Sequence, residues 1–279
     1  MGPSFLAAIF AISAATAWGS GGFTGGLASR RVGPFHAVLI SHAAGLLALV
    51  TVAIIRLEML PPLADFMWGG LAGLSAMAGL VFFFQGIATG RMGIVAPVSA
   101  VLATAIPVIF VALTGGIAGE LQLLGFGLAV LSIWLLSRPE RFSGRPAGLS
   151  MALLSGLGFG GFFIAIGQVG ESAVFWPLAA GRLASFILML SFAFSTRRPV
   201  IPLFSQLWLL VIAGVLDVSG NLFFLLSIQS GRLDISAVLG SLYPAVTVFL
   251  AWLITKERMA RLQVIGIVIA IMATVLIAF

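Results

Sequence analysis

Long apolar stretches dominate the chain, and short charged or Pro/Gly-rich segments divide them into ten runs. A helix needs about 20 apolar residues to cross the hydrocarbon core of a bilayer. The runs comprise residues 4–27, 35–55, 66–88, 94–114, 121–137, 147–168, 174–195, 204–228, 235–254 and 262–279. They lack the polar/apolar alternation of barrel strands, and a helix satisfies every backbone amide within its own segment. The pattern predicts an all-α membrane protein with ten transmembrane helices.

Composition supports this prediction and excludes several other classes of protein. Hydrophobic residues make up 61% of the chain and charged residues 8%, too few to cover a soluble domain of this length. Cysteine is absent, which excludes disulfides, cysteine metal sites and thiol nucleophiles. We expect the first apolar run to be retained as a span, because it is too long for a signal peptide and lacks a basic start.

The two halves of the chain are copies in a fixed register. Across residues 68–91, eight of 24 positions carry the same residue type as the position 141 residues later. Composition alone would give roughly two or three such matches. We therefore assign residues 1–138 to the first repeat, 139–146 to a connecting loop and 147–279 to the second repeat.

Each copy contains five predicted spans, and this odd number has a topological consequence. The second copy must enter the membrane from the side opposite to the first, so the repeats are inverted. Inverted repeats are typical of secondary transporters, which hold their substrate in a central cavity near the bilayer midplane. The alternative is that the duplication only builds a stable helix bundle.

Charges in the loops predict the orientation of the chain. Loops on one face carry 11 Lys and Arg residues, whereas the opposite face carries only Arg56 and Arg232. Short cytoplasmic loops accumulate these residues, so both termini are expected outside the cytoplasm of a multi-pass protein of the cell inner membrane. The same bias accounts for the net charge of +6. The sequence has no basic stripe with interleaved aromatics, so we expect no nucleic-acid partner.

Corresponding motifs flank the fourth span of each copy. They are Gly90-Arg91 and Gly231-Arg232 before this span, Glu120 and Glu257 after it, and the matching tracts 121–125 and 262–266. In these features the chain resembles the drug/metabolite transporter superfamily, and more narrowly its EamA-type ten-helix exporters. The resemblance implies export of small metabolites, with the aromatic amino acid exporters nearest. Relatives more often keep both termini in the cytoplasm, which opposes the charge bias.

One departure from this superfamily concerns energy coupling. Its small multidrug members couple transport to protons through a Glu in the first helix, and residues 4–27 contain no carboxylate here. That mechanism is not carried over. Coupling to protons, coupling to an exchange partner and uncoupled transport all stay open.

Two charged residues lie inside predicted spans, where charge is costly and calls for an explanation. Arg182 and Asp217 belong to consecutive spans and can form an ion pair that holds both in the bundle. Alternatively, Asp217 and Asn221, one helical turn apart, form a polar ledge that binds the amino end of a substrate or a proton.

Enzymatic and metal-binding patterns are absent from the sequence. His36 and His42 are six residues apart and so lie on different faces of one helix, the wrong spacing for joint metal ligation. His42 is the deeper one, either bonded to a neighbouring helix or able to titrate in a cavity. We expect no cofactor, no metal and no enzymatic activity.

Aromatic and neutral polar residues at mid-span depth are candidates for lining a cavity. An apolar cavity with a few polar groups suits amphipathic solutes. Besides His42, Asp217 and Asn221, the candidates are Trp18, Phe83, Gln85, Ser99, Phe159, Phe224, Ser241 and Tyr243. Hinge or packing roles are expected for Gly19, Gly22, Pro97, Pro107, Gly160 and Pro244, since glycine permits close approach and proline frees a carbonyl.

Together these features predict an exporter of small amphipathic metabolites, preferably amino acids including aromatic ones, that works by alternating access. Its partners would be a small solute and the lipid bilayer, and the protein would be either a monomer or a homodimer. The alternatives are a nucleotide sugar or cationic drug as substrate, a channel subunit, or an integral membrane enzyme acting on lipids. The enzyme would need clustered carboxylates or histidines at one membrane face.

Overall fold

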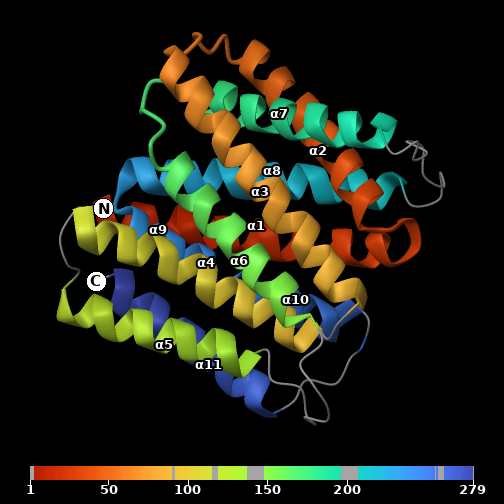
Figure 1. Cartoon of the computed structure of the whole chain (residues 1–279). Coiled ribbons are helices and arrows are strands. Elements are labelled where there is room, and N and C mark those ends of the chain that lie inside the picture. Colours follow the sequence, from red (N-terminus) through yellow and green to blue (C-terminus); the bar gives the residue numbers. More distant parts are fainter. Residues whose placement is uncertain are drawn as a thin grey trace.

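The computed structural model describes residues 3–89, 92–114, 119–136, 148–195, 207–254, 256 and 261–278 (Figure 1). Within these ranges all regular secondary structure is helical. The helices are α1 (Pro3–Val32), α2 (Pro34–Ile55), α3 (Leu63–Thr89), α4 (Met92–Thr114), α5 (Glu120–Leu136), α6 (Leu149–Ile166), α7 (Phe175–Ser195), α8 (Leu207–Ser230), α9 (Leu233–Gly240), α10 (Tyr243–Ile254) and α11 (Arg261–Ala278). The proposed connecting loop 139–146 lies outside the described residues.

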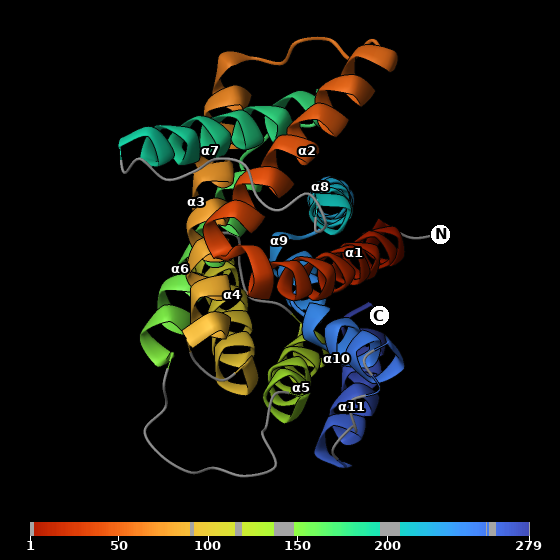
Figure 2. The ribbon, with the colours of Figure 1, turned by 90° about the vertical axis from the view of Figure 1, so that its right-hand side faces the viewer.

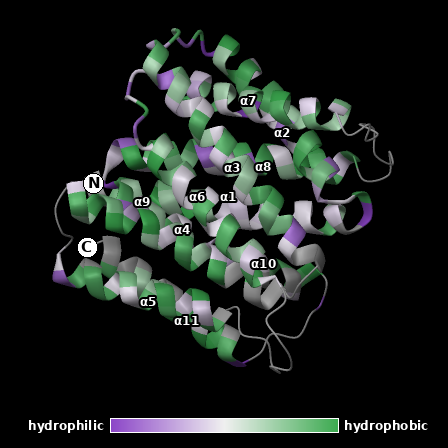
Figure 3. Cartoon of the chain, viewed as in Figure 1, coloured by the Kyte–Doolittle hydropathy of each residue, from purple (hydrophilic) through white to green (hydrophobic). Residues whose placement is uncertain are grey.

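These helices account for the ten predicted spans. Among the described residues, seven spans are long and apolar enough to cross a membrane: α1, α2, α3, α6, α7, α8 and the α9–α10 pair taken together. The remaining three are α4, α5 and α11, all strongly apolar. Large apolar side chains are exposed on the outside of the bundle, for example Leu47 of α2, Leu113 of α4 and Phe194 of α7. Hydrophobic residues also make up most of the bundle seen in Figure 3. Lipid is the solvent that such a surface requires.

The ninth predicted span is broken, which the apolar pattern did not reveal. Pro244 has no amide hydrogen to donate to the carbonyl of Gly240 four residues earlier. The chain turns at Ser241-Leu242, where the Leu242 amide donates to the Leu239 carbonyl at 3.2 Å instead. The other two candidate prolines, Pro97 and Pro107, lie within α4, which continues through both.

The two five-helix copies are inverted, as predicted. In Figure 1, α1 begins and α11 ends at the same end of the bundle, whereas α5 ends and α6 begins at the opposite end. The repeat makes α1 equivalent to α6, α2 to α7 and α3 to α8, and the packing follows this equivalence. Thus α1 packs on α8 as α6 packs on α3, and α2 packs on α8 as α7 packs on α3. The self-equivalent pairs, α2 with α7 and α5 with α11, lie at opposite margins of the bundle in Figures 1 and 2. A pseudo-two-fold axis therefore runs through both pairs.

Glycine permits the closest contacts between the copies. A Cβ at Gly73 in α3 would lie 2.1 Å from the carbonyl oxygen of Gly181 in α7. Its repeat equivalent, Gly214 in α8, meets the carbonyl oxygen of Ser41 in α2, where a Cβ would lie 2.3 Å away. These two identical residues of the repeat thus make equivalent backbone contacts on the two sides of the axis.

A carboxylate from the first copy caps a helix of the second. Glu58, in the loop after α2, accepts hydrogen bonds from the amides of Val174, Phe175 and Trp176 at 2.8–3.2 Å. These amides begin α7 and have no partner within the helix, and negative charge is favourable at this end of the helix dipole. Asp65, at the start of α3, adds a second contact of this kind between the copies, because it accepts a hydrogen bond from the Gly170 amide at 3.1 Å.

Replacement of Glu58 by alanine should destabilise the fold, because three amides at the start of α7 lose a charged acceptor. We expect a loss of about 1–3 kcal/mol in the free energy of unfolding, read as a lower melting temperature in detergent. Glu171→Ala, an exposed position in the neighbouring loop, is the control and should change stability by less than about 0.5 kcal/mol. Equal melting temperatures for the two variants would contradict the capping role.

Replacement of Gly73 by alanine should separate α3 from α7, since the added methyl group meets a carbonyl oxygen. The expected cost is about 3 kcal/mol from overpacking. Gly127→Ala on α5 is the matched control, because nothing lies within 4 Å of its added Cβ; a helical Gly-to-Ala change in open space stabilises by about 0.4–1 kcal/mol. Thermal melting of both purified variants decides the matter, and a Gly73→Ala protein as stable as the Gly127→Ala protein would refute the close contact.

Candidate functional site

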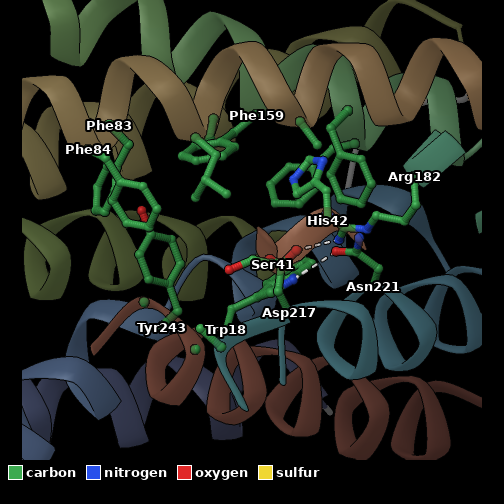
Figure 4. Close-up of a pocket in the computed structure, with 18 residues that line it drawn as sticks. Trp18, Ser41, His42, Phe83, Phe84, Phe159, Arg182, Asp217, Asn221 and Tyr243 are labelled. Atoms are coloured by element: carbon green, nitrogen blue, oxygen red, sulfur yellow. Dashed lines mark hydrogen bonds and ion pairs between the residues drawn. The ribbon is translucent and has the colours of Figure 1, made fainter. Parts of the chain in front are cut away.

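A cavity of about 90 Å³ lies between the two repeats (Figure 4). This volume holds several water molecules. Its walls come from α1, α2, α3, α4, α6, α7, α8 and α10. Both copies thus contribute to one chamber inside the bundle.

The cavity straddles the pseudo-two-fold axis, as the lining residues show. Twelve of the 18 form pairs whose members are 141 positions apart: Trp18 with Phe159, Gly21 with Phe162, Gly22 with Phe163, Ser41 with Arg182, Ala76 with Asp217, and Leu80 with Asn221. Equivalent positions of inverted copies meet only where the axis passes. The chamber therefore occupies the repeat interface, the place expected for a solute site in such folds.

The paired positions differ in chemistry, so the cavity is asymmetric. Arg182, Asp217 and Asn221 belong to the second copy, and their equivalents in the first copy are Ser41, Ala76 and Leu80. Conversely, the two glycines of α1 that line the cavity are equivalent to two phenylalanines of α6. Divergence between the copies has thus given the second copy the charged pair and the first copy small residues that leave space.

Two rings of the cavity wall are seated on repeat-equivalent glycines. The indole of Trp18 lies over Gly220, where a Cβ would be 2.4 Å from the ring, and the ring of Phe159 lies over Gly79, where it would be 2.6 Å away. The Trp18 ring also packs against Phe224, with centroids 5.3 Å apart. Its Nε1 donates to Asn221 Oδ1 at 2.9 Å. Packing and this hydrogen bond together fix the orientation of the indole.

The two charged residues inside the spans form the predicted ion pair. Arg182 Nη2 donates to Asp217 Oδ2, which joins α7 to α8. The arginine side chain is only 4% exposed, whereas that of the aspartate is 25% exposed. Asp217 and Asn221, the residues of the predicted ledge, both line the cavity. The ion pair and the ledge are thus parts of one polar region.

Two further polar side chains reach the cavity without finding partners. His42 is buried, and neither ring nitrogen has a hydrogen-bond partner within the described part of the chain. The hydroxyl of Tyr243 is likewise buried and unpartnered there, and its ring meets Phe83 edge-on with centroids 6.5 Å apart. In Figure 4, His42 lies beside Arg182, and Tyr243 lies at the other end of the chamber beside Phe83 and Phe84.

Seven of the predicted cavity residues line the chamber: Trp18, His42, Phe83, Phe159, Asp217, Asn221 and Tyr243. Four do not. Gln85 is exposed, because it lies two residues and so about 200° around the helix from Phe83. Ser99 is buried and donates to the Ala152 carbonyl at 3.1 Å. The remaining two, Phe224 and Ser241, are fully buried, Phe224 behind Trp18 and Ser241 at the break in the ninth span.

The glycines and prolines predicted as hinges or packing points fall into three groups. Gly19 and Gly160 are repeat equivalents at helix contacts, where an added Cβ would lie 2.6 Å from Val246 and 2.5 Å from Ile106, respectively. Gly22 lines the cavity, and nothing lies within 4 Å of an added Cβ. Pro107 and Pro244 are buried, while the side chain of Pro97 lies outside the described residues.

Sequence reasoning missed several lining residues, among them Ser41, Phe84, Phe162 and Phe163, and considered Arg182 only as the partner of Asp217. A signal for some of them was present. Subtracting 141 from Arg182 gives Ser41, and adding 141 to the glycines at 21 and 22 gives the two phenylalanines. The repeat register, applied to the charged residues and the first-span glycines, would have found them.

Comparison with known proteins gives one family. The model of the EamA-like transporter family matches residues 5–138 and again residues 146–279. An uncharacterized protein of Methanocaldococcus jannaschii is 30% identical over 131 residues, 47% of this chain and 93% of that protein, so the match is about one repeat long. One solved crystal structure of a protein superposes with a TM-score of 0.76 over 97% of this chain and 95% of that chain at 16% identity. At that identity the likeness shows a common fold.

Proposed function

Because the chain belongs to the EamA-like transporter family, we propose that this membrane transporter exports small amphipathic metabolites, amino acids including aromatic ones among them. The observation that supports this substrate class is the chemistry of the chamber on the repeat axis. Seven of its 18 lining residues are Trp, Phe or Tyr, contributed by both copies, and a compact polar region sits at one end. Such a lining accommodates an apolar body with one polar head.

Alternating access follows from the inverted architecture in this proposal. Two copies related by an in-plane axis can rock about a fixed central site and expose it to either face in turn. The break at Ser241-Leu242 places a turn directly before Tyr243, which lines the chamber. In this proposal, the rocking of the two copies also breaks the hydrogen bonds between Glu58 and the start of α7 at one end of the bundle.

The orientation and the driving force belong to the same proposal. The Lys and Arg bias puts both termini on the non-cytoplasmic side of the inner membrane. The first span offers no carboxylate for proton exchange, and the carboxylate in the chamber, Asp217, is paired with Arg182. We therefore favour an exporter that works down the gradient of its own substrate.

Filling the chamber should stop transport without harming the fold, which Gly22→Leu tests. The new side chain projects into open space, so the helix gains a better helix former while the solute loses its room. In proteoliposomes containing purified protein, counterflow of radiolabelled amino acids should be saturable for the unsubstituted chain and fall at least about tenfold for this variant.

Gly127→Leu on α5 controls for the change of residue type, since its added Cβ also meets open space and it lies away from the cavity. It should transport normally, and both variants should melt at or above the temperature of the unsubstituted protein. Full transport by Gly22→Leu would contradict the proposed site, and linear, non-saturable flux through the unsubstituted chain would indicate a channel.

A further inference from the structure

The polar groups of the chamber gather at one end, opposite the ring-lined end. Figure 4 shows His42, Arg182, Asp217 and Asn221 together on one side, with Phe83, Phe84 and Tyr243 on the other and Phe159 between. These polar groups come from α2, α7 and α8, two copies of the repeat. A solute that fits the chamber is therefore held by a head at one end and a body at the other.

The ion pair at this end has unused hydrogen-bonding capacity on both partners. A guanidinium has five N–H donors and a carboxylate has about four acceptor positions. Within the described chain, Arg182 and Asp217 engage each other through one donor and one oxygen. The second aspartate oxygen and the other guanidinium donors are left to meet a solute.

His42 supplies an independent sign that a ligand belongs here. Its side chain is 1% exposed, it lines the chamber, and both ring nitrogens lack partners among the described residues. Burying such donors and acceptors unpaired costs free energy. A ligand that offers a hydrogen-bonding head to the imidazole recovers that cost.

The charge balance decides which head fits best. Arg182 and Asp217 sum to zero, so a purely anionic or purely cationic head would bring an uncompensated charge into a chamber walled by rings. A head that carries both charges opposes the pair, with its cation on the aspartate and its anion on the arginine, and adds no net charge. The pair, read as a dipole, selects a zwitterion.

We propose that Arg182, Asp217 and His42 form the head-group site for an α-amino acid zwitterion. The α-ammonium lies on Asp217, the α-carboxylate lies on Arg182 and His42, and the side chain extends along Trp18 and Phe159 towards Phe83. The inference rests on the proposed function and narrows its substrate class to solutes that carry an ammonium and a carboxylate on the same carbon atom.

Competition with three analogues tests the head-group site. Counterflow of radiolabelled L-phenylalanine is measured in proteoliposomes against unlabelled L-phenylalanine, its amide, which keeps only the ammonium, and its N-acetyl derivative, which keeps only the carboxylate. Phenylalanine should compete at least about tenfold more strongly than either analogue.

Two charge variants should then shift the preference in opposite directions. Asp217→Asn leaves Arg182 unopposed, so the N-acetyl derivative should gain on the amide by at least about tenfold. Arg182→Gln should favour the amide by a similar factor. The ratio of the two inhibition constants does not depend on how much protein folds. The double variant, which leaves no unpaired charge, substitutes for a single variant that fails to fold and should bring all three competitors within about threefold of one another.

Asp234→Asn is the matched control, because Asp234 forms the other described ion pair, with Arg232, and does not line the chamber. It should keep the preference of the unsubstituted protein. Equal competition by the three compounds, or variants that weaken all three alike, would overturn the head-group site while leaving the transporter proposal intact. Absence of saturable counterflow of any amino acid would instead contradict the proposed function.

Discussion

The contact between the two inverted copies is the constraint on which the rest of the structure depends. Lipid offers no hydrophobic drive to hold helices together, so close backbone packing must do so. Gly73 against Gly181 and Gly214 against Ser41 provide it at equivalent places in the two copies. Because these contacts repeat across one axis, the helices around that axis are fixed in position, and the chamber lies among them.

Within this frame, divergence at equivalent positions creates a binding site. A strictly symmetric chamber would present every group twice, including like charges facing each other across the axis. Here the residue equivalent to Arg182 in the first copy is Ser41, and the residue equivalent to Asp217 is Ala76. The chamber therefore contains one arginine and one aspartate, which neutralise each other. Symmetry thus sets the location of the chamber, and its loss sets the chemistry.

Much of this architecture could be predicted from the sequence. Spans in lipid must be apolar runs, and the register of 141 residues, with five spans in each copy, implies the inversion. The position of a residue along its span also indicates its approximate depth in the membrane, and this identified Trp18, Phe159, Asp217 and Asn221 as cavity candidates. The side of the helix is harder to infer. Ser99 lies within α4 but faces away from the chamber, and Gln85 lies only four residues before the end of α3 and is exposed. Apolar residues surround these helices on all sides, so no hydrophobic stripe marks the inner face.

The central claim, a solute chamber on the axis of two inverted repeats that opens to each face in turn, has a direct test. The chain contains no cysteine, so Ala76→Cys places a single thiol in the chamber wall, at the position equivalent to Asp217. In vesicles, a membrane-impermeant thiol reagent applied from either side should label this residue, and substrate should slow the labelling from both sides. Labelling from one side only, or none from either side, would contradict the account.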